Sequence, residues 1–168
     1  DDCFFDPTSL PFYAIQIADD EDPAYTLSPV SGTLAEGNSQ TATVSLVLLV
    51  APLTDVIIDI ASMDTTEVTL SQASLTFNAI NWNVPQNITL SSADEDLVDG
   101  PQTVSITASI NATSDALFTD LADQTRTLVH SDNDFAGFTV SPLLGTLTEG
   151  DSQTASLTVV LNKQPLSN

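Results

Sequence analysis

Hydrophobic and polar residues alternate through most of the central part of the chain. A period of two indicates strands that bury one face and expose the other. Clusters of Gly, Asn, Asp and Ser interrupt the alternation, as expected for turns, and no segment has the apolar period of about 3.6 residues that a buried helix face needs. The pattern predicts strands near residues 25–29, 39–50, 55–61, 66–70, 73–77, 85–93, 101–112 and 124–131.

The number and spacing of these strands predict an all-β fold. About seven short strands separated by turn residues are typical of an antiparallel immunoglobulin-like β-sandwich. Trp82 lies in an Asn-rich turn, and we expect it to pack at one end of the sandwich rather than to stack on a carbohydrate.

The chain also contains an internal repeat with a constant offset of 113 residues. Residues 26–37 read TLSPVSGTLAEG and residues 139–150 read TVSPLLGTLTEG. From 24–55 against 137–168 the alignment has no gaps, and 16 of its 32 pairs are identical, which chance does not produce. Fixed-period similarity of this length indicates copies of an independently folding domain.

The offset divides the chain into three parts. Residues 1–23 are expected to be the tail of a preceding repeat, 24–136 a complete sandwich, and 137–168 the head of a following repeat, so the fold is a tandem array. The same offset places His130 on Ile17, so its side chain should point inward. A lone histidine makes a poor zinc site, and we interpret it as a satisfied core or rim residue.

The composition of the chain disfavours several classes of partner. Two basic residues face 23 acidic ones, for a formal net charge of −21, which disfavours nucleic acid and anionic membrane surfaces as partners. The longest apolar run, Val44 to Pro52, is too short for a membrane helix, so we expect no membrane insertion. Cys3 is the only cysteine, which leaves an inert core thiol or a bond to a part of the protein outside this sequence.

No recognisable catalytic motif occurs. The sequence has no nucleophilic serine motif with a histidine partner, no Gly-rich phosphate loop and no Cys–His pair. Carboxylates are abundant but lie in predicted strand-exit loops without the cleft that a glycosidase requires. We therefore expect that the protein is not an enzyme.

Several motifs together resemble one known family. They are Ser-Pro-x-x-Gly-Thr-Leu-x-Glu-Gly, Ser71 to Phe77, Asn81-Trp-Asn-Val-Pro-Gln86, Asp94-Glu-Asp-Leu-Val-Asp-Gly100 and the closing Asp132-Asn-Asp134. In combination they resemble the Calx-beta-like tandem repeats of large extracellular microbial surface and adhesin proteins. The resemblance covers the complete repeat and both partial ones, and it implies chained β-sandwiches outside the cell.

The resemblance also implies a calcium site at one tip of the sandwich, formed by the glutamate after the first strand, an acidic loop and the exit from the last strand. Glu95, Asp99 and Asn133 depart from the family pattern, but all three can offer the oxygen ligands that calcium takes. The alternative is that these residues are ordinary solvated turns. The residues carried over are Glu36, Asp94, Glu95, Asp96, Asp99, Asp132, Asn133 and Asp134, with Asp64 as a further ligand.

Two sequons offer glycosylation sites. Asn87 should face solvent because it alternates with Ile88, and Asn111 lies at the end of its predicted strand. Both are acceptors if the source organism glycosylates asparagine.

Three functions remain open. The first is a structural or adhesive stalk of a secreted or cell-surface protein, stiffened by calcium between neighbouring repeats, while other parts of the parent protein contact cell-surface or carbohydrate ligands. The second is a calcium-sensing regulatory module of the exchanger Calx-beta type. The third, a lectin-like domain, has no specific support. The copying of the repeat and the scarcity of lysine favour the extracellular stalk.

Overall fold

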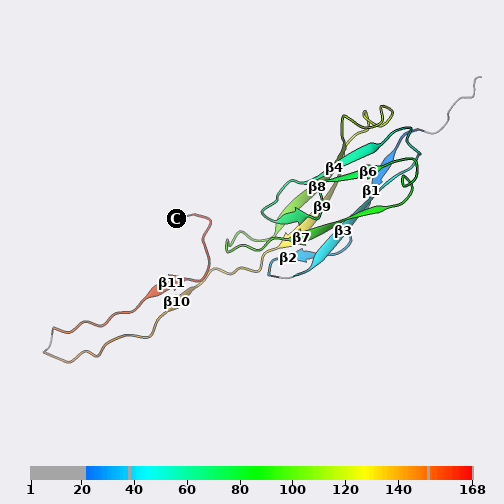
Figure 1. The fold of residues 1–168 in the computed structure, drawn as a ribbon. Helices are drawn as coiled ribbons and strands as arrows, with labels where there is room; N and C mark the ends of the chain where they lie inside the picture. The colour runs from blue at the N-terminus through cyan, green and yellow to red at the C-terminus, as the bar shows by residue number, and fades with distance from the viewer. Residues whose placement is uncertain (1–21, 38, 151, 168) are drawn as a thin grey trace, which may run out of the picture.

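The computed structural model describes residues 22–37, 39–150 and 152–167 (Figure 1). Every regular element in these residues is a strand. Residues 1–21, with Cys3 and most of the predicted tail of a preceding repeat, lie outside the described part. The strands are β1 (Tyr25–Leu27), β2 (Leu34–Ala35), β3 (Thr41–Leu48), β4 (Val56–Ser62), β5 (Val68–Leu70), β6 (Ser74–Phe77), β7 (Gln86–Ser92), β8 (Gln102–Ile110), β9 (Gln124–Ser131), β10 (Phe138–Val140) and β11 (Val159–Leu161).

Nine of these strands form a β-sandwich. One sheet has the order β1-β3-β7-β5 and the other β2-β9-β8-β4-β6. All neighbours are antiparallel except β2 and β9, which pair in parallel. The predicted all-β, immunoglobulin-like sandwich is confirmed, and the predicted strand positions agree with eight of its strands. The two-residue strand β2 was not predicted.

The core follows from the alternation seen in the sequence. In β3 every second residue from Ala42 to Leu48 is buried, and the same holds along β4, β7 and β8. Phe77 and Phe118 are the largest fully buried side chains. Each buried aliphatic or aromatic side chain contributes about 1.5–3 kcal/mol relative to exposure, so these inward faces supply the main stabilisation of the sandwich.

Trp82 lies where the sequence pattern placed it. Its side chain is partly buried against the core, and its carbonyl oxygen accepts a hydrogen bond of 3.0 Å from the amide of Leu48 at the end of β3. It therefore packs at this end of the sandwich.

Asp115 organises the same end. Its carboxylate accepts backbone hydrogen bonds from Leu53 (2.7 Å), Thr54 (2.8 Å) and Leu117 (3.0 Å). Although the residue is buried, these donors hold the pKa of Asp115 below its usual value. The carboxylate thus joins the loop after β3 to the loop after β8.

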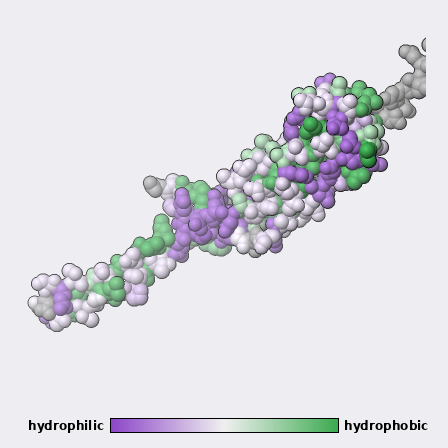
Figure 2. Space-filling view, in the orientation of Figure 1, coloured by the Kyte–Doolittle hydropathy of each residue, from purple (hydrophilic) through white to green (hydrophobic). Residues whose placement is uncertain are grey.

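β10 and β11 form a separate two-stranded sheet that extends away from the sandwich (Figure 1). Their register, Phe138 opposite Leu161, repeats the register of Tyr25 opposite Leu48 in β1 and β3 at the offset of 113 residues. In Figure 2 apolar residues are visible along this hairpin, and Leu161 is 60% exposed where Leu48 is 1% exposed. The hairpin therefore has the backbone of the first strand pair of a sandwich, but no sheet among the described residues covers its apolar side chains.

A glycine is required at the same point of both strand pairs. Gly32 has a φ of 112° and Gly145 a φ of 108°. A Cβ atom at these positions would lie 3.0 Å from the backbone of Thr41 and Ala42, and 3.2 Å from that of Thr154. Both observations agree with a copied unit, while the domain boundaries 1–23, 24–136 and 137–168 remain a prediction.

The two strand pairs allow a matched test of core burial. Leu48→Ala should lower the free energy of unfolding by about 2–5 kcal/mol because it leaves a cavity in a closed core. Leu161→Ala, the same change at the aligned position, should cost less than about 0.5 kcal/mol because that side chain is exposed. Urea denaturation followed by tryptophan fluorescence measures both. Equal losses would mean that the hairpin is buried in solution.

A second prediction concerns Asp115. Asp115→Asn should destabilise the sandwich by about 2 kcal/mol at neutral pH, because charge-assisted bonds to three amides become weaker. The folded-state pKa is depressed, so this contribution is present above the unfolded pKa and is lost as pH falls through the folded pKa. The difference between wild type and variant should therefore shrink below about pH 4. Asp120→Asn, an exposed change in the same loop, is the control, and a pH-independent difference would contradict the prediction.

Candidate cation site at the tip of the sandwich

Acidic residues from four segments meet at one end of the sandwich, which we call the tip. It comprises the end of β9, the residues after β2, the start of β5 and the loop between β7 and β8. Figure 2 shows hydrophilic side chains gathered at this end, where the hairpin emerges. The tip lies opposite the end that Asp115 organises.

Backbone pairing brings two of these segments together. Leu34 and Ala35 pair in parallel with His130 and Ser131, and the amide of Glu36 donates a 3.0 Å hydrogen bond to the carbonyl of Ser131. The two segments that follow β2 and β9 then leave the sheet side by side. Glu36 and the acidic residues after Ser131 consequently lie next to one another.

The first cluster contains Glu36, Asp132 and Asp134, with one carboxylate oxygen of each within 4.8 Å of the others. Glu36 is 3% and Asp134 6% exposed. The amide of Asn133 donates to Glu36 Oε2 at 3.4 Å, whereas Asp132 accepts from the amides of Asp134 at 2.5 Å and Gly100 at 2.7 Å. The loop is folded so that its carboxylates face inward.

The second cluster contains Glu67, Glu95 and Asp99, again within 4.8 Å of one another. Glu67 is 4% exposed, and its carbonyl accepts a 2.8 Å hydrogen bond from the amide of Ala93, which fixes the start of β5 beside the end of β7. Glu67 is not among the ligands that the sequence motifs predict. A single glutamate before a short strand has no local signal, and only the pairing of β5 with β7 places it at the tip.

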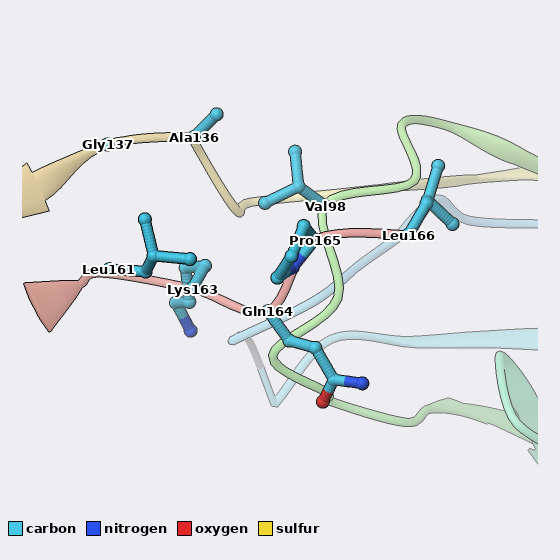
Figure 3. Close-up of a pocket in the computed structure, with 8 residues that line it drawn as sticks. All are labelled: Val98, Ala136, Gly137, Leu161, Lys163, Gln164, Pro165 and Leu166. Atoms are coloured by element: carbon cyan, nitrogen blue, oxygen red, sulfur yellow. The ribbon is translucent and has the colours of Figure 1, made fainter. Parts of the chain in front are cut away.

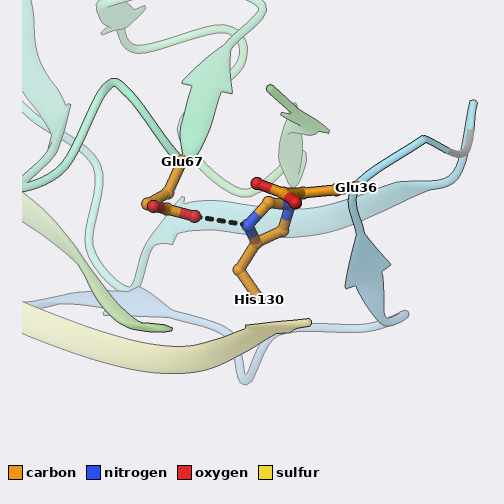
Figure 4. A group of neighbouring side chains, drawn as sticks. All are labelled: Glu36, Glu67 and His130. Atoms are coloured by element: carbon orange, nitrogen blue, oxygen red, sulfur yellow. Dashed lines mark hydrogen bonds and ion pairs between the residues drawn. The ribbon is translucent and has the colours of Figure 1, made fainter. Parts of the chain in front are cut away.

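His130 connects the two clusters (Figure 4). Its Nδ1 lies 2.6 Å from Glu67 Oε2 and its Nε2 lies 2.5 Å from Ser92 Oγ. Glu36, Glu67 and His130 also have ligand atoms within 4.8 Å of one another. The inward orientation expected for His130 is confirmed, since the residue is 1% exposed.

The order Ser92, His130, Glu67 has the connectivity of a hydrolytic triad but not its accessibility. A triad needs its imidazole within reach of a substrate, and the His130 side chain is fully buried. The Ser92 hydroxyl also lies 3.0 Å from the carbonyl of Ala35. We therefore interpret His130 as a group that holds Glu67 in place.

Four of the nine residues expected to bind metal lie outside these clusters. Asp64 accepts hydrogen bonds from the Thr66 amide (3.0 Å) and hydroxyl (2.5 Å), so its carboxylate closes a local turn. Asp94 and Asn133 are exposed, and Asp96 forms an ion pair with Lys163. The five that the fold brings into the clusters are Glu36, Glu95, Asp99, Asp132 and Asp134.

Gly37 allows Glu36 and Asn133 to approach. It has a φ of 66°, and a Cβ atom there would overlap with Asn133 Nδ2. Only glycine fits this contact without displacing the side-chain amide of Asn133.

The electrostatics of the tip are unfavourable for carboxylates alone. Burial raises the pKa of Glu36, and the charges of Asp132 and Glu67 raise it further. Burial likewise raises the pKa of Glu95, with added repulsion from Glu67 and Asp99. Hydrogen bonding, led by the amide of Asp134, lowers the pKa of Asp132. The surroundings of Asp132 thus favour its charged form, whereas those of Glu36 and Glu95 disfavour theirs.

Asp134 provides the test of whether a cation fits. Its side chain is 1% exposed, and Oδ2 has no hydrogen-bond partner among the described residues. Lys163 Nζ lies 2.8 Å from Oδ1, without hydrogen-bond geometry. A buried carboxylate oxygen without a donor, next to Glu36 and Asp132, fits a hard cation with oxygen ligands.

The two sequons differ in their surroundings. The side chain of Asn87 is exposed on β7. Asn111 is half-buried, donates from Nδ2 to Asp59 at 2.7 Å and accepts from the Thr113 amide and hydroxyl. Of the two predicted acceptors, Asn87 is the more accessible.

Comparisons with known proteins add information on the fold alone. No family model and no curated protein matches the chain, and none of the described elements is a helix long and apolar enough to cross a membrane. Among solved structures, the chain is similar to SSP-19, an MSP-domain-like protein of Caenorhabditis elegans, at 12% identity and a TM-score of 0.38 over 62% of this chain and 98% of that one. It is also similar to the class 5 fimbriae chaperone CfaA, at 11% identity and a TM-score of 0.41 over 83% and 67% of the two chains. Similarity at this level does not extend to function.

Proposed function

We propose that this chain is a segment of an extracellular or cell-surface stalk built from Calx-beta-like sandwiches joined end to end. The supporting observation is the repeated strand pair, because β10 and β11 have the register of β1 and β3 at an offset of 113 residues. A unit copied with this fidelity gives an array in which each unit contacts its neighbours. Neighbouring repeats are therefore the first partners that we propose, and other parts of the parent protein would contact external ligands.

Calcium at the tip is the second part of the proposal. The ligands would be Glu36, Asp132 and Asp134 in one cluster and Glu67, Glu95 and Asp99 in the other. Two unit charges about 4 Å apart repel by about 4 kcal/mol at an effective dielectric of 20. Several such pairs are comparable with a domain's stability of about 5–15 kcal/mol, and a divalent cation relieves them.

The position of the first cluster links the ion to the joint between units. Asp132 and Asp134 directly follow β9, and Phe138 already begins β10. An ion that holds this short connection against Glu36 would restrict the angle between one sandwich and the next. This is how calcium would stiffen a stalk.

A calcium-sensing regulatory module would use the same two clusters. The two functions differ in the calcium affinity they require. Sensors bind in the range of about 10⁻⁷–10⁻⁵ M and extracellular modules at about 10⁻⁴–10⁻³ M. We expect the weaker range here. Antibody labelling of intact cells tests the location independently.

Calcium should stabilise the protein. At about 10 mM calcium and a dissociation constant of about 0.1–1 mM, the gain is about 1.4–2.7 kcal/mol, which raises the melting temperature by about 5–10 °C for a domain of this size. Excess chelator should reverse the shift, as measured by calorimetry. A melting temperature that does not differ between calcium and chelator would refute the cation site.

Glu36→Gln should have opposite effects with and without calcium. The folded-state pKa of Glu36 is raised, so its ionisation destabilises the fold as pH rises through that pKa. In chelator at neutral pH the variant should be more stable than wild type, and the difference should vanish in acid. In calcium it should lose much of the ion-dependent gain.

Asp94→Asn is the matched control for this change. It removes the same charge from the same end of the sandwich, but the side chain is exposed and outside both clusters. It should change melting little in either condition. Equal behaviour of the two variants would mean that only net charge matters.

A further inference from the structure

The chain returns to the tip of the sandwich after β11. The amide of Gln164 donates to the carbonyl of Asp96 at 2.8 Å, and the amide of Val98 donates to the carbonyl of Gln164 at 3.2 Å. Leu97 and Gln164 thereby form a parallel bridge. We call these contacts, together with those of Lys163, the junction.

Apolar side chains line one side of the junction (Figure 3). Val98 from the sandwich and Leu161, Pro165 and Leu166 from the hairpin segment line a small cavity of about 220 Å³. The junction therefore combines two backbone hydrogen bonds with an open apolar pocket, in which Leu161 and Leu166 remain largely exposed.

Lys163 links the hairpin segment to the tip of the sandwich by two ion pairs. Its Nζ lies 2.8 Å from Asp134 Oδ1 and 2.5 Å from Asp96 Oδ1. The Asp134 side chain is 1% exposed and the Asp96 side chain 79%, so the pair with Asp134 is the less screened by water. Asp134 and then Asp96 hold the pKa of Lys163 above its usual value, and the ammonium remains charged.

The same carboxylate belongs to the first acidic cluster with Glu36 and Asp132. We propose that Lys163 is a tethered counter-ion that closes the junction and competes with a divalent cation for Asp134. The competition rests on the proposed cation site, whereas the closure by Lys163 rests only on the contacts above. At low calcium the lysine neutralises Asp134 and holds the joint. At high calcium the ion displaces the lysine and holds the same connection through Glu36, Asp132 and Asp134.

Of the two joints that the repeat predicts in this sequence, the alignment gives the lysine to one. The residue aligned with Lys163 is Val50, and the residue aligned with Asp134 is Glu21. The joint before the sandwich therefore has the acid but not the lysine. Successive joints of the array would then depend on calcium to different degrees.

The chain offers a matched control because it has only two basic residues, Lys163 and Arg126. Arg126 donates to the carbonyls of Leu27 and Thr125, and β9 carries it well away from the junction. Lys163→Gln and Arg126→Gln change the net charge equally. Lys163→Arg keeps the charge at the junction and should preserve wild-type behaviour.

The first measurement is amide hydrogen exchange of the 168-residue chain in excess chelator. Lys163→Gln should speed exchange of the Val98 and Gln164 amides about tenfold, which corresponds to about 1.4 kcal/mol. The amide of Leu46 in β3 should be unaffected and reports that the sandwich stays folded. Arg126→Gln should leave the two junction amides unchanged. Unchanged exchange of these amides in Lys163→Gln overturns the inference.

The second measurement is calcium binding by calorimetry on the same proteins. Lys163→Gln should bind about tenfold more tightly than wild type, because Asp134 no longer has a competing cation, while Arg126→Gln and Lys163→Arg should bind as wild type. Equal affinity of wild type and Lys163→Gln overturns the competition. If neither protein binds calcium, the proposed cation site is wrong and the competition with it, a result that the exchange measurement distinguishes from failure of the lysine closure.

Discussion

Leu34 and Ala35 pair in parallel with His130 and Ser131, and the tip of the molecule depends on this short ladder. Antiparallel neighbours run in opposite directions, so their exits lie at opposite ends of a sheet. A parallel pair instead delivers both exits to one end. Glu36 and the residues after β9 therefore leave the sandwich together, and their carboxylates must either be neutralised or raise the energy of the fold.

Three kinds of interaction stabilise the carboxylates at the tip. Backbone amides hold Asp132, the buried His130 holds Glu67, and Lys163 approaches Asp134 from the hairpin. What remains is a buried oxygen of Asp134 with no donor among the described residues and two carboxylates whose pKa values are raised by burial. The unpartnered oxygen and the raised pKa values favour binding of a divalent cation. They also explain why the chain's own lysine would compete with such an ion.

The junction connects the repeated strand pair to the acidic tip. The hairpin repeats the backbone of β1 and β3, but its apolar side chains are exposed, so the contacts that orient it on the sandwich are few and lie next to the acidic tip. We therefore expect that a change in charge at Asp134 alters the orientation of the hairpin without affecting the distant core. In an array, a change at each joint adds up along the chain.

Alternation and self-similarity are local or periodic properties, so the sequence alone predicts eight strands of the sandwich, their buried faces, the inward histidine and the 113-residue copy. It also selected Glu36, Glu95, Asp99, Asp132 and Asp134, through the resemblance of their motifs. Which of the acidic residues meet at the tip depends on contacts between distant parts of the chain. Glu67 and the two residues of β2 acquire their places from partners far along the chain, and Asp64 is occupied by its own turn. Likewise, Lys163 reaches Asp134 only because the hairpin folds back, a contact between residues 29 positions apart that no periodicity encodes.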